Sequence, residues 1–225
     1  MKYVIANWKQ NKTLDEAVLW CRDFVRLVES ANFKGVIPII CPPAPFLEKM
    51  WSILKWDVPT SAPAVELGVQ DISPFADGAH TGFVGVNQVK EFCKYAVVGH
   101  SERQELPDVV LEKVARCLDA DIIPIVCFKF SGDYQQHKRA IYALEDPQNI
   151  SSGGIYRAKS TKEVQNLVDA GRKFFGYESN IIYGGSVNEE NAQDLASIKN
   201  LNGVLVGNAS LNPAEFADIV GKFSV

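Results

Sequence analysis

Two glycine-rich turns contain the residue types that bind phosphate. Residues 183–186 read Tyr-Gly-Gly-Ser, and residues 203–210 read Gly-Val-Leu-Val-Gly-Asn-Ala-Ser. Each turn follows an apolar run that is typical of a strand and precedes a helical segment. Small residues there let backbone N–H groups at a helix N-terminus surround an anion. One such turn is more often a plain tight connection, but two in succession predict a site for a phosphorylated substrate.

Four polar residues follow other apolar runs of the chain. Asn7 and Lys9 come after the first run, His100 after the fourth and Glu145 at the end of the sixth. A carboxylate base, an imidazole that donates a hydrogen bond and a cation beside a developing oxyanion are the groups needed to abstract a proton next to a carbonyl. Together with the glycine turns, they predict proton transfer on a phosphorylated carbonyl compound.

Each of these residues also has an ordinary structural explanation. A lysine such as Lys9 is usually a surface residue, His100 could be a core histidine with satisfied hydrogen bonds, and Glu145 could be a solvated carboxylate before a turn. Trp8 is expected to pack rather than to react. The occurrence of all three candidates at strand ends favours the functional interpretation.

The two remaining histidines of the sequence are expected to be structural. His80 and His137 lack neighbouring motifs, so we expect them on the surface or at an interface. Glu102 and Arg103 could form only a local ion pair.

Eight short apolar runs alternate with amphipathic segments and predict eight strands. Their continuous apolar character is typical of a buried parallel sheet. Phosphate-type turns after strands seven and eight are characteristic of a (β/α)8 barrel, in which the chemistry lies at the carboxyl ends of the strands. We therefore predict one such barrel as a single domain over residues 1–225, with strands at 3–7, 36–41, 65–69, 95–99, 122–127, 140–145, 180–183 and 203–206.

Helix starts are marked by capping residues. Thr13 with Glu16 and Ser160 with Glu163 have the spacing of capping boxes, and Asn212 precedes Pro213 at the last helix. These signals predict helices that begin just after positions 13, 160 and 212.

Composition excludes several classes of function. The 225 residues carry a formal net charge of −4, and their 23 Lys and Arg residues are scattered, so nucleic-acid binding is not expected. No apolar run reaches membrane-spanning length, and the sequence opens on a predicted strand rather than a signal peptide. These features predict a cytosolic protein that does not bind membranes.

The five cysteines lack the spacing of a metal site and lie in apolar segments: Cys21, Cys41, Cys93, Cys117 and Cys127. We predict buried free thiols.

Five ordered segments carry a resemblance to a known family. They are 7–9 (Asn-Trp-Lys), 70–82, 99–103 (Gly-His-Ser-Glu-Arg), 183–186 and 205–207. Along nearly its whole length the chain resembles the triosephosphate isomerase family.

The resemblance implies a cofactor- and metal-free interconversion of dihydroxyacetone phosphate and D-glyceraldehyde 3-phosphate in glycolysis and gluconeogenesis. It implies that Glu145 moves the proton, that His100 polarises the carbonyl as a neutral imidazole, the established form of this residue in the family, and that Lys9 and Asn7 stabilise the oxyanion and substrate. Glu102 would support these residues without contacting the substrate itself. The phosphate would bind backbone N–H groups of Ser151, Ser186, Gly207 and Asn208. A homo-oligomer is implied, a dimer or a tetramer, with segment 70–82 at its interface.

The chain departs from the family pattern around the lid loop. Asp146, Pro147 and Gln148 follow Glu145, where the family usually has proline and then tryptophan. The family's glycine and glutamate after strand five are replaced within residues 128–130. This paired loss predicts a rebuilt lid contact, while Ser151 keeps a small residue at the lid tip.

Two further departures concern a helix and the last turn. The segment 131–139 between strands five and six is shortened, and a neighbouring subunit could cover the barrel surface that it leaves bare. Asn208 replaces the second glycine of the strand-eight turn. If that position needs a positive φ, asparagine is among the least penalised substitutes.

Two other functions remain open at this point. Asp146 could raise the pKa of Glu145 or disturb closure, which would give an isomerase-fold phosphate-binding protein with weak or lost turnover. A binding module that retains only the phosphate site is the second alternative. It does not explain why Lys9, His100 and Glu145 are all present.

Overall fold

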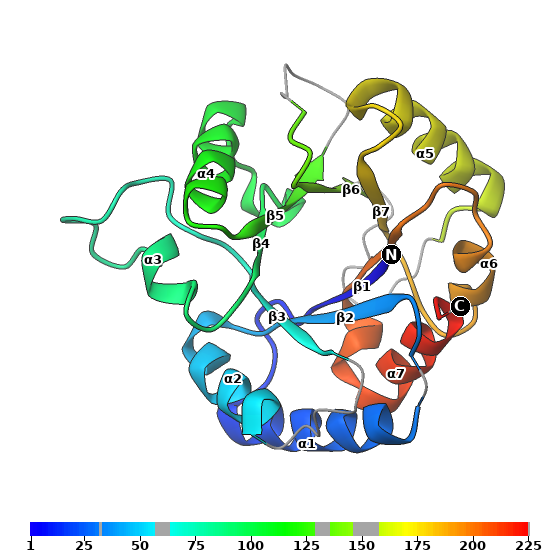
Figure 1. Ribbon diagram of the computed structural model, residues 1–225, viewed down its shortest axis with the longest axis horizontal. Helices are drawn as coiled ribbons and strands as arrows, with labels where there is room; N and C mark the ends of the chain where they lie inside the picture. The colour runs from blue at the N-terminus through cyan, green and yellow to red at the C-terminus, as the bar shows by residue number, and fades with distance from the viewer. Residues whose placement is uncertain (32, 57–63, 129–135, 146–157, 225) are drawn as a thin grey trace.

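Eight parallel strands form a closed barrel in the order in which they occur along the chain (Figure 1). The computed structural model describes residues 1–31, 33–56, 64–128, 136–145 and 158–224. The strands are β1 (Lys2–Asn7), β2 (Val36–Cys41), β3 (Glu66–Val69), β4 (Tyr95–Val98), β5 (Ile123–Phe128), β6 (Ile141–Glu145), β7 (Asn180–Gly184) and β8 (Gly203–Val206). The predictions of eight strands and of a (β/α)8 barrel are confirmed. Most of the shortened segment 131–139 and all of the altered lid residues 146–149 lie outside the described residues.

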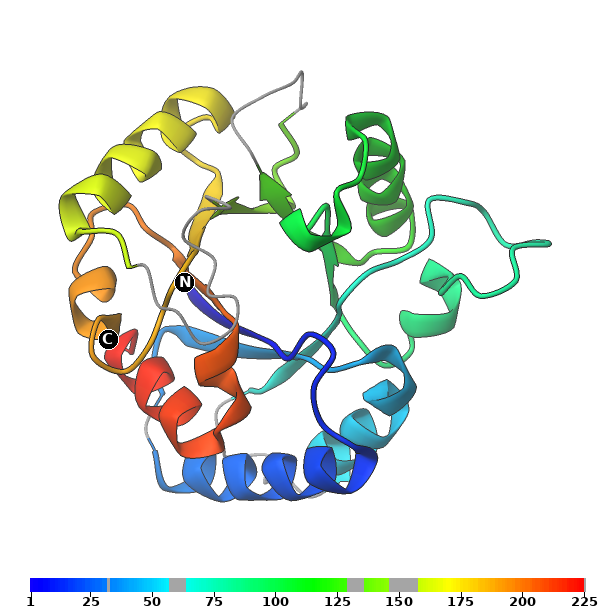
Figure 2. The ribbon, with the colours of Figure 1, turned by 180° about the vertical axis from the view of Figure 1, so that it is seen from behind.

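Helices surround the barrel. They are α1 (Leu14–Ser30), α2 (Leu47–Trp56), α3 (Val86–Val89), α4 (Pro107–Asp119), α5 (Thr161–Phe175), α6 (Ala192–Ala196) and α7 (Pro213–Lys222), with short 3-10 turns η1 (Ala44–Phe46), η2 (Ser101–Arg103) and η4 (Asn208–Leu211). Helix α3 is a single turn, and the long β3–β4 connection that contains it extends away from the barrel, as both views show (Figures 1 and 2).

Successive side chains of each strand point to opposite faces of the sheet, and this divides the apolar residues between two cores. One side of each strand fills the barrel interior with residues such as Ile5, Ile39 and Ile182. The other side packs against the helices in a larger cluster that includes Val4 and Phe24. The interior is therefore a packed core, and the open ends of the strands hold the polar groups.

The predicted helix starts are confirmed by hydrogen bonds. The Thr13 and Ser160 side chains each accept from the backbone N–H three residues later, and the Glu16 and Glu163 side chains accept from the backbone N–H of Thr13 and Ser160 in return. The Asn212 side chain accepts from two N–H groups of the first turn of α7. These caps satisfy backbone donors that a helix leaves unpaired.

Two expectations about buried side chains are also met. All five cysteines are buried and free. Trp8 is fully buried and packs edge-on against Trp20, with the ring centroids 4.8 Å apart.

Among the described helices, none combines the length and the apolar character that crossing a bilayer requires.

Candidate active site

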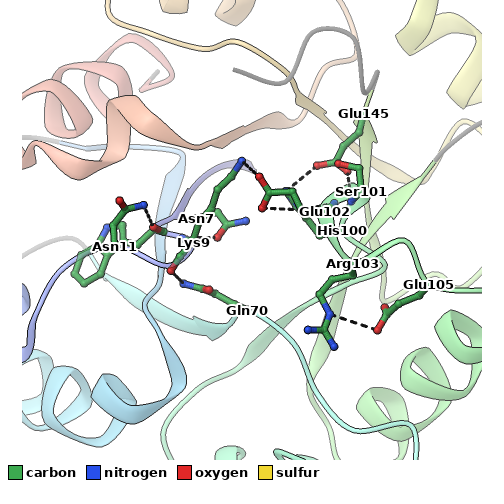
Figure 3. Close-up of polar contacts among 11 residues, drawn as sticks. Asn7, Lys9, Asn11, Gln70, His100, Ser101, Glu102, Arg103, Glu105 and Glu145 are labelled. Atoms are coloured by element: carbon green, nitrogen blue, oxygen red, sulfur yellow. Dashed lines mark hydrogen bonds and ion pairs between the residues drawn. The ribbon is translucent and has the colours of Figure 1, made fainter. Parts of the chain in front are cut away.

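Lys9 is held in an uncommon backbone conformation just after β1. Its φ is 52°, in the left-handed region that residues with a side chain rarely adopt. Its N–H donates to Oδ1 of Asn7 at 3.1 Å. Its Nζ lies 2.7 Å from Oε1 of Glu102, so the lysine side chain extends across the barrel mouth toward β4 (Figure 3). An ammonium group is thereby fixed at the carboxyl ends of the strands.

His100 follows β4 and begins the short turn η2. Gly99 before it has a φ of 72°, and a Cβ there would lie 3.1 Å from the Val110 side chain, so glycine suits this position. The backbone N–H of Glu102 donates to Nδ1 of His100 at 3.2 Å. Because Nδ1 accepts this bond, the neutral ring carries its proton on Nε2. The imidazole is 7% exposed and presents an N–H donor to the barrel mouth.

Glu145 ends β6, and its carboxylate faces His100. Oε1 lies 3.3 Å from Nε2 of His100, and Oε2 accepts from the backbone N–H of Ser101 at 3.1 Å (Figure 3). The side chain is only 3% exposed. Burial raises the pKa of the neighbouring Cys127 thiol, and the Glu145 carboxylate raises it further. A buried carboxylate with fixed hydrogen-bond partners has the position required of a general base.

The glycine turns after β7 and β8 form the opposite wall. A Cβ at Gly184 would lie 3.0 Å from Cγ of Glu145, and one at Gly185 would lie 2.2 Å from the Tyr183 hydroxyl oxygen. A Cβ at Gly207 would lie 3.7 Å from Cε of Lys9. Glycine thus lets the backbone after β7 approach the Glu145 and Tyr183 side chains closely. A small cleft is lined by Asn7, Lys9, His100, Glu145, Gly184, Gly185, Leu205 and Gly207.

The predicted site residues are distributed as follows. Asn7, Lys9, His100, Glu145 and Gly207 line one cleft. The buried Ser186 follows a residue of that cleft, and Asn208 begins η4 directly after Gly207. Asn208 is not among the described residues with positive φ, so its replacement of glycine causes no left-handed strain. Ser151 lies outside the described residues.

Glu102 and Arg103, for which a local ion pair was the alternative, have other partners. Glu102 pairs with Lys9, while Nη2 of Arg103 contacts Oδ2 of Asp71 at 2.9 Å and its Nε lies 3.6 Å from Oε1 of Glu105. Neighbouring residues on a 3-10 turn project in different directions, and each finds a partner on another strand end.

His80 and His137 lie apart from the cleft, as expected. The His80 ring is exposed and stacks on Phe75 with centroids 4.3 Å apart. The backbone N–H of the half-buried His137 donates to the Tyr142 hydroxyl at 2.7 Å.

Two features were not found by sequence reasoning. Gln70, just after β3, donates to the Lys9 carbonyl at 3.0 Å. The nearly buried Lys113 of α4 contacts the carboxylates of Asp71 and Glu105. The signal available for Gln70 was its place at a strand end, which it shares with Asn7.

Among the described residues, no three His, Cys, Asp or Glu side chains are grouped so that they could hold a metal ion. The site offers a base, a hydrogen-bond donor, a cation and backbone N–H groups. This arrangement can move a proton beside a carbonyl group without other components.

Comparison with known proteins identifies the family. The family model described as triosephosphate isomerase matches residues 2–223. A triosephosphate isomerase from Polynucleobacter asymbioticus is 31% identical over 247 aligned positions, covering 96% of this chain and 97% of the relative. Triosephosphate isomerases from Aquifex aeolicus and Dehalococcoides mccartyi are each 30% identical, covering 99% of this chain and 99% and 96% of the relatives. The chain belongs to the triosephosphate isomerase family.

Proposed function

We propose that Glu145, His100 and Lys9 carry out the interconversion of dihydroxyacetone phosphate and D-glyceraldehyde 3-phosphate. The observation that supports these roles is the 3.3 Å distance between Nε2 of His100 and Oε1 of Glu145 in a cleft that Lys9 also lines. At this distance the two groups contact each other directly, so a substrate would displace the contact, with its carbonyl taking the Nε2–H donor and the carboxylate facing the neighbouring carbon. No cofactor or metal ion is needed for this reaction.

Glu145 is the base. Its carboxylate takes a proton from C1 of dihydroxyacetone phosphate, and the electron pair of the broken C–H bond forms the double bond of an enediolate. The proton of the C1 hydroxyl must also pass to the oxygen on C2. Return of the abstracted proton from the carboxylic acid to C2 then gives the aldehyde and regenerates the carboxylate. Oε2 accepts from the Ser101 N–H at 3.1 Å, and we assign the transfer to Oε1, which exchanges its contact with His100 for the substrate.

His100 and Lys9 stabilise the negative charge of the intermediate. The Nε2–H of His100 donates to the oxygen at which charge develops, and fixed donors of this kind supply a large part of catalysis. The Lys9 ammonium offsets the enediolate and phosphate charges. Glu102 holds that ammonium in place through their 2.7 Å contact, and Asn7 completes the polar lining.

The phosphate binds to the glycine turns. We assign its donors to the backbone N–H groups of Ser186, Gly207 and Asn208, with Ser151 contributing from outside the described residues. Support comes from Gly207, where a Cβ would lie 3.7 Å from Cε of Lys9, so the turn after β8 runs beside the Lys9 side chain.

The direct test is a coupled isomerase assay on the wild type and on Glu145→Gln, which keeps the shape and removes the base. We expect wild-type turnover and a loss of about 10²–10⁴-fold in the variant. Glu48→Gln on the exposed side of α2 is the matched control and should retain full activity. If neither wild type nor Glu145→Gln turns over while a phosphorylated transition-state analogue still binds, the alternative of a phosphate-binding barrel with lost turnover holds. Asp146→Pro then tests whether Asp146 is the cause.

We further infer that the chain works as a homodimer or larger homo-oligomer. The connection between β3 and β4 presents Phe75 and Phe83, which are 45% and 51% exposed and pack edge to face. A hollow next to Lys9, lined also by Gln10, Thr81 and Arg103, is available for the same segment of a second copy. Light scattering distinguishes monomer, dimer and tetramer, and activity on dilution shows whether assembly matters.

A cytoplasmic location completes the proposal. The reaction belongs to glycolysis and gluconeogenesis, and its substrates are small soluble phosphates. Fractionation of cells that express the chain would test the location.

A further inference from the structure

The left-handed conformation of Lys9 needs an explanation, because lysine does not favour it. The Lys9 N–H donates to Oδ1 of Asn7, and this bond fixes only one side of the residue. The preceding carbonyl, that of Trp8, accepts from Nδ2 of Asn11 at 2.6 Å. The Lys9 carbonyl accepts from Nε2 of Gln70 at 3.0 Å. Side-chain amides therefore hold the backbone at three successive points.

Gln70 differs from the other two amides because it comes from another strand. It follows β3, and Nε2 also donates to the carbonyl of Cys41, the last residue of β2, at 3.0 Å. Both N–H groups of the amide are thus used by backbone carbonyls. Figure 3 shows the Gln70 side chain reaching the Lys9 backbone from the side opposite the Lys9 ammonium. A residue at the end of β3 thus holds the backbone of Lys9, which follows β1.

We propose that Gln70 is a positioning residue for Lys9. Its hydrogen bond to the Lys9 carbonyl, anchored by its second bond to the Cys41 carbonyl, keeps Lys9 in the left-handed conformation from which Nζ contacts Glu102 and the side chain lines the cleft. Gln70 is not among the residues that line the catalytic cleft, so it acts through Lys9 rather than on the substrate. This inference rests on the proposed role of Lys9 in the isomerisation.

A purely structural role of Gln70 would have different consequences. If the amide only tied β2 to the loop after β1, its loss would lower the melting temperature and leave the activity of the folded enzyme unchanged. If it positions Lys9, its loss should lower kcat/KM of fully folded enzyme. The Lys9 side chain should then also be found in another place.

The test uses Gln70→Met, which keeps the length and removes both donors. We expect kcat/KM to fall about 10- to 100-fold, since a misplacement of about 1 Å can cost 10²-fold. A crystal structure of the variant should show Lys9 outside the left-handed region and its contact with Glu102 broken. The matched control is Gln165→Met on α5. Nε2 of Gln165 also makes two hydrogen bonds, to Oδ1 of Asp169 at 3.0 Å and to the Lys199 carbonyl at 3.2 Å. This control should retain wild-type kcat/KM.

Gln70→Glu provides a second variant, in which the loss of kcat/KM should depend on pH. An ionised carboxylate would place an oxygen against the carbonyls of Lys9 and Cys41, so the loss at neutral pH should exceed that of Gln70→Met. Protonation of the introduced carboxyl restores one donor. The ratio of variant to wild-type kcat/KM should therefore rise as the pH is lowered, which a loss of packing would not produce.

Several outcomes would overturn the proposal. Wild-type kcat/KM in Gln70→Met is one, and a loss of activity with Lys9 unmoved in the crystal structure is another. If Gln70→Met does not fold, Gln70 is required for the stability of the barrel rather than for the position of Lys9. An inactive wild type would refute the proposed function, and the conformation of Lys9 in the variant crystal would still decide the role of Gln70.

Discussion

Nε2 of His100 lies 3.3 Å from Oε1 of Glu145, while Nδ1 of the same ring accepts the backbone N–H of Glu102 at 3.2 Å. The backbone thereby selects the tautomer that the chemistry needs. A ring that must accept at Nδ1 can donate only from Nε2 as long as it is neutral. The Nε2–H donor and the carboxylate are thus in direct contact, and in the proposed reaction a substrate carbonyl would replace Glu145 as the partner of that donor.

Replacing His100 should affect turnover more than substrate binding. In His100→Gln, an amide can still donate but lacks the fixed direction of Nε2–H. We expect kcat to fall about 10²–10³-fold, as when one oxyanion donor is removed. KM should change by less than about threefold, because the donor acts mainly on charge that develops in the transition state. Steady-state kinetics decide this, and a rise in KM without loss of kcat would contradict it.

The turn after β7 should not tolerate a methyl group. A Cβ at Gly185 would lie 2.2 Å from the Tyr183 hydroxyl oxygen, so Gly185→Ala must shift the turn that we assign to phosphate binding. A decrease in kcat/KM of about 10- to 100-fold is expected from such a shift. Gly221→Ala in α7 is the control, since its Cβ would meet only Phe33 at 3.8 Å. Equal kinetics in the two variants would show that the turn is not part of the site.

Removing Lys113 should destabilise the barrel strongly. Its side chain is 2% exposed and contacts Oε1 of Glu105 at 2.5 Å and a carboxylate oxygen of Asp71. Lys113→Met removes the buried cation and leaves the two carboxylates with the half-exposed Arg103 as their remaining partner. The loss of unfolding free energy should therefore approach but not exceed about 3–5 kcal/mol, which is the cost of breaking a buried ion pair. Urea unfolding at pH 7 measures this. Lys49→Met, at an exposed position of α2, should cost almost nothing.

The same variant should regain stability in acid. Burial raises the pKa of Asp71 above its ordinary value, and the contact with Lys113 opposes that shift. Without Lys113 the pKa of Asp71 rises further in the folded state. An acid whose pKa is raised by folding binds protons more readily when folded, so stability increases as the pH falls toward that pKa. The deficit of Lys113→Met should therefore become smaller as the pH is lowered from 7 toward the raised pKa of Asp71. A constant deficit would count against this mechanism.

The thiols should be unreactive in the folded protein. All five are buried, and burial raises the pKa of Cys93 and of Cys117 to about 12. The thiolate is the reactive form, so little of it exists at pH 8. A thiol reagent should detect none of the five before unfolding and all five in denaturant. Rapid labelling of one thiol in the native state would locate a segment that opens.

Much of the fold could be predicted because local and global signals agree. The strand near 36–41 is apolar throughout, as a strand buried on both faces must be, and the structure has it as β2 (Val36–Cys41). The capping pair Thr13 and Glu16 marks the start of α1 within one residue. The candidate residues Lys9, His100 and Glu145 were found because each follows a strand, and closure of the barrel brings strand ends together.

The unpredicted contacts depend on three-dimensional packing. Nothing in the sequence near Gln70 indicates that its amide reaches Lys9, because the approach of β3 to the loop after β1 is set by the closed sheet. Lys113 lies on the helical face that the sequence marks as apolar, yet it is buried by two carboxylates from other segments. For the same reason, the partners of Arg103 were not predicted.

The proximity of Lys9 to Gly207 has a consequence for the synthesis of the protein. One residue follows β1 and the other follows β8, and β1 pairs directly with β8. A ribosome-bound chain therefore cannot form the anion site until its eighth strand has emerged and closed the ring. Premature termination anywhere before that strand should yield a polypeptide that neither binds triose phosphates nor competes for them.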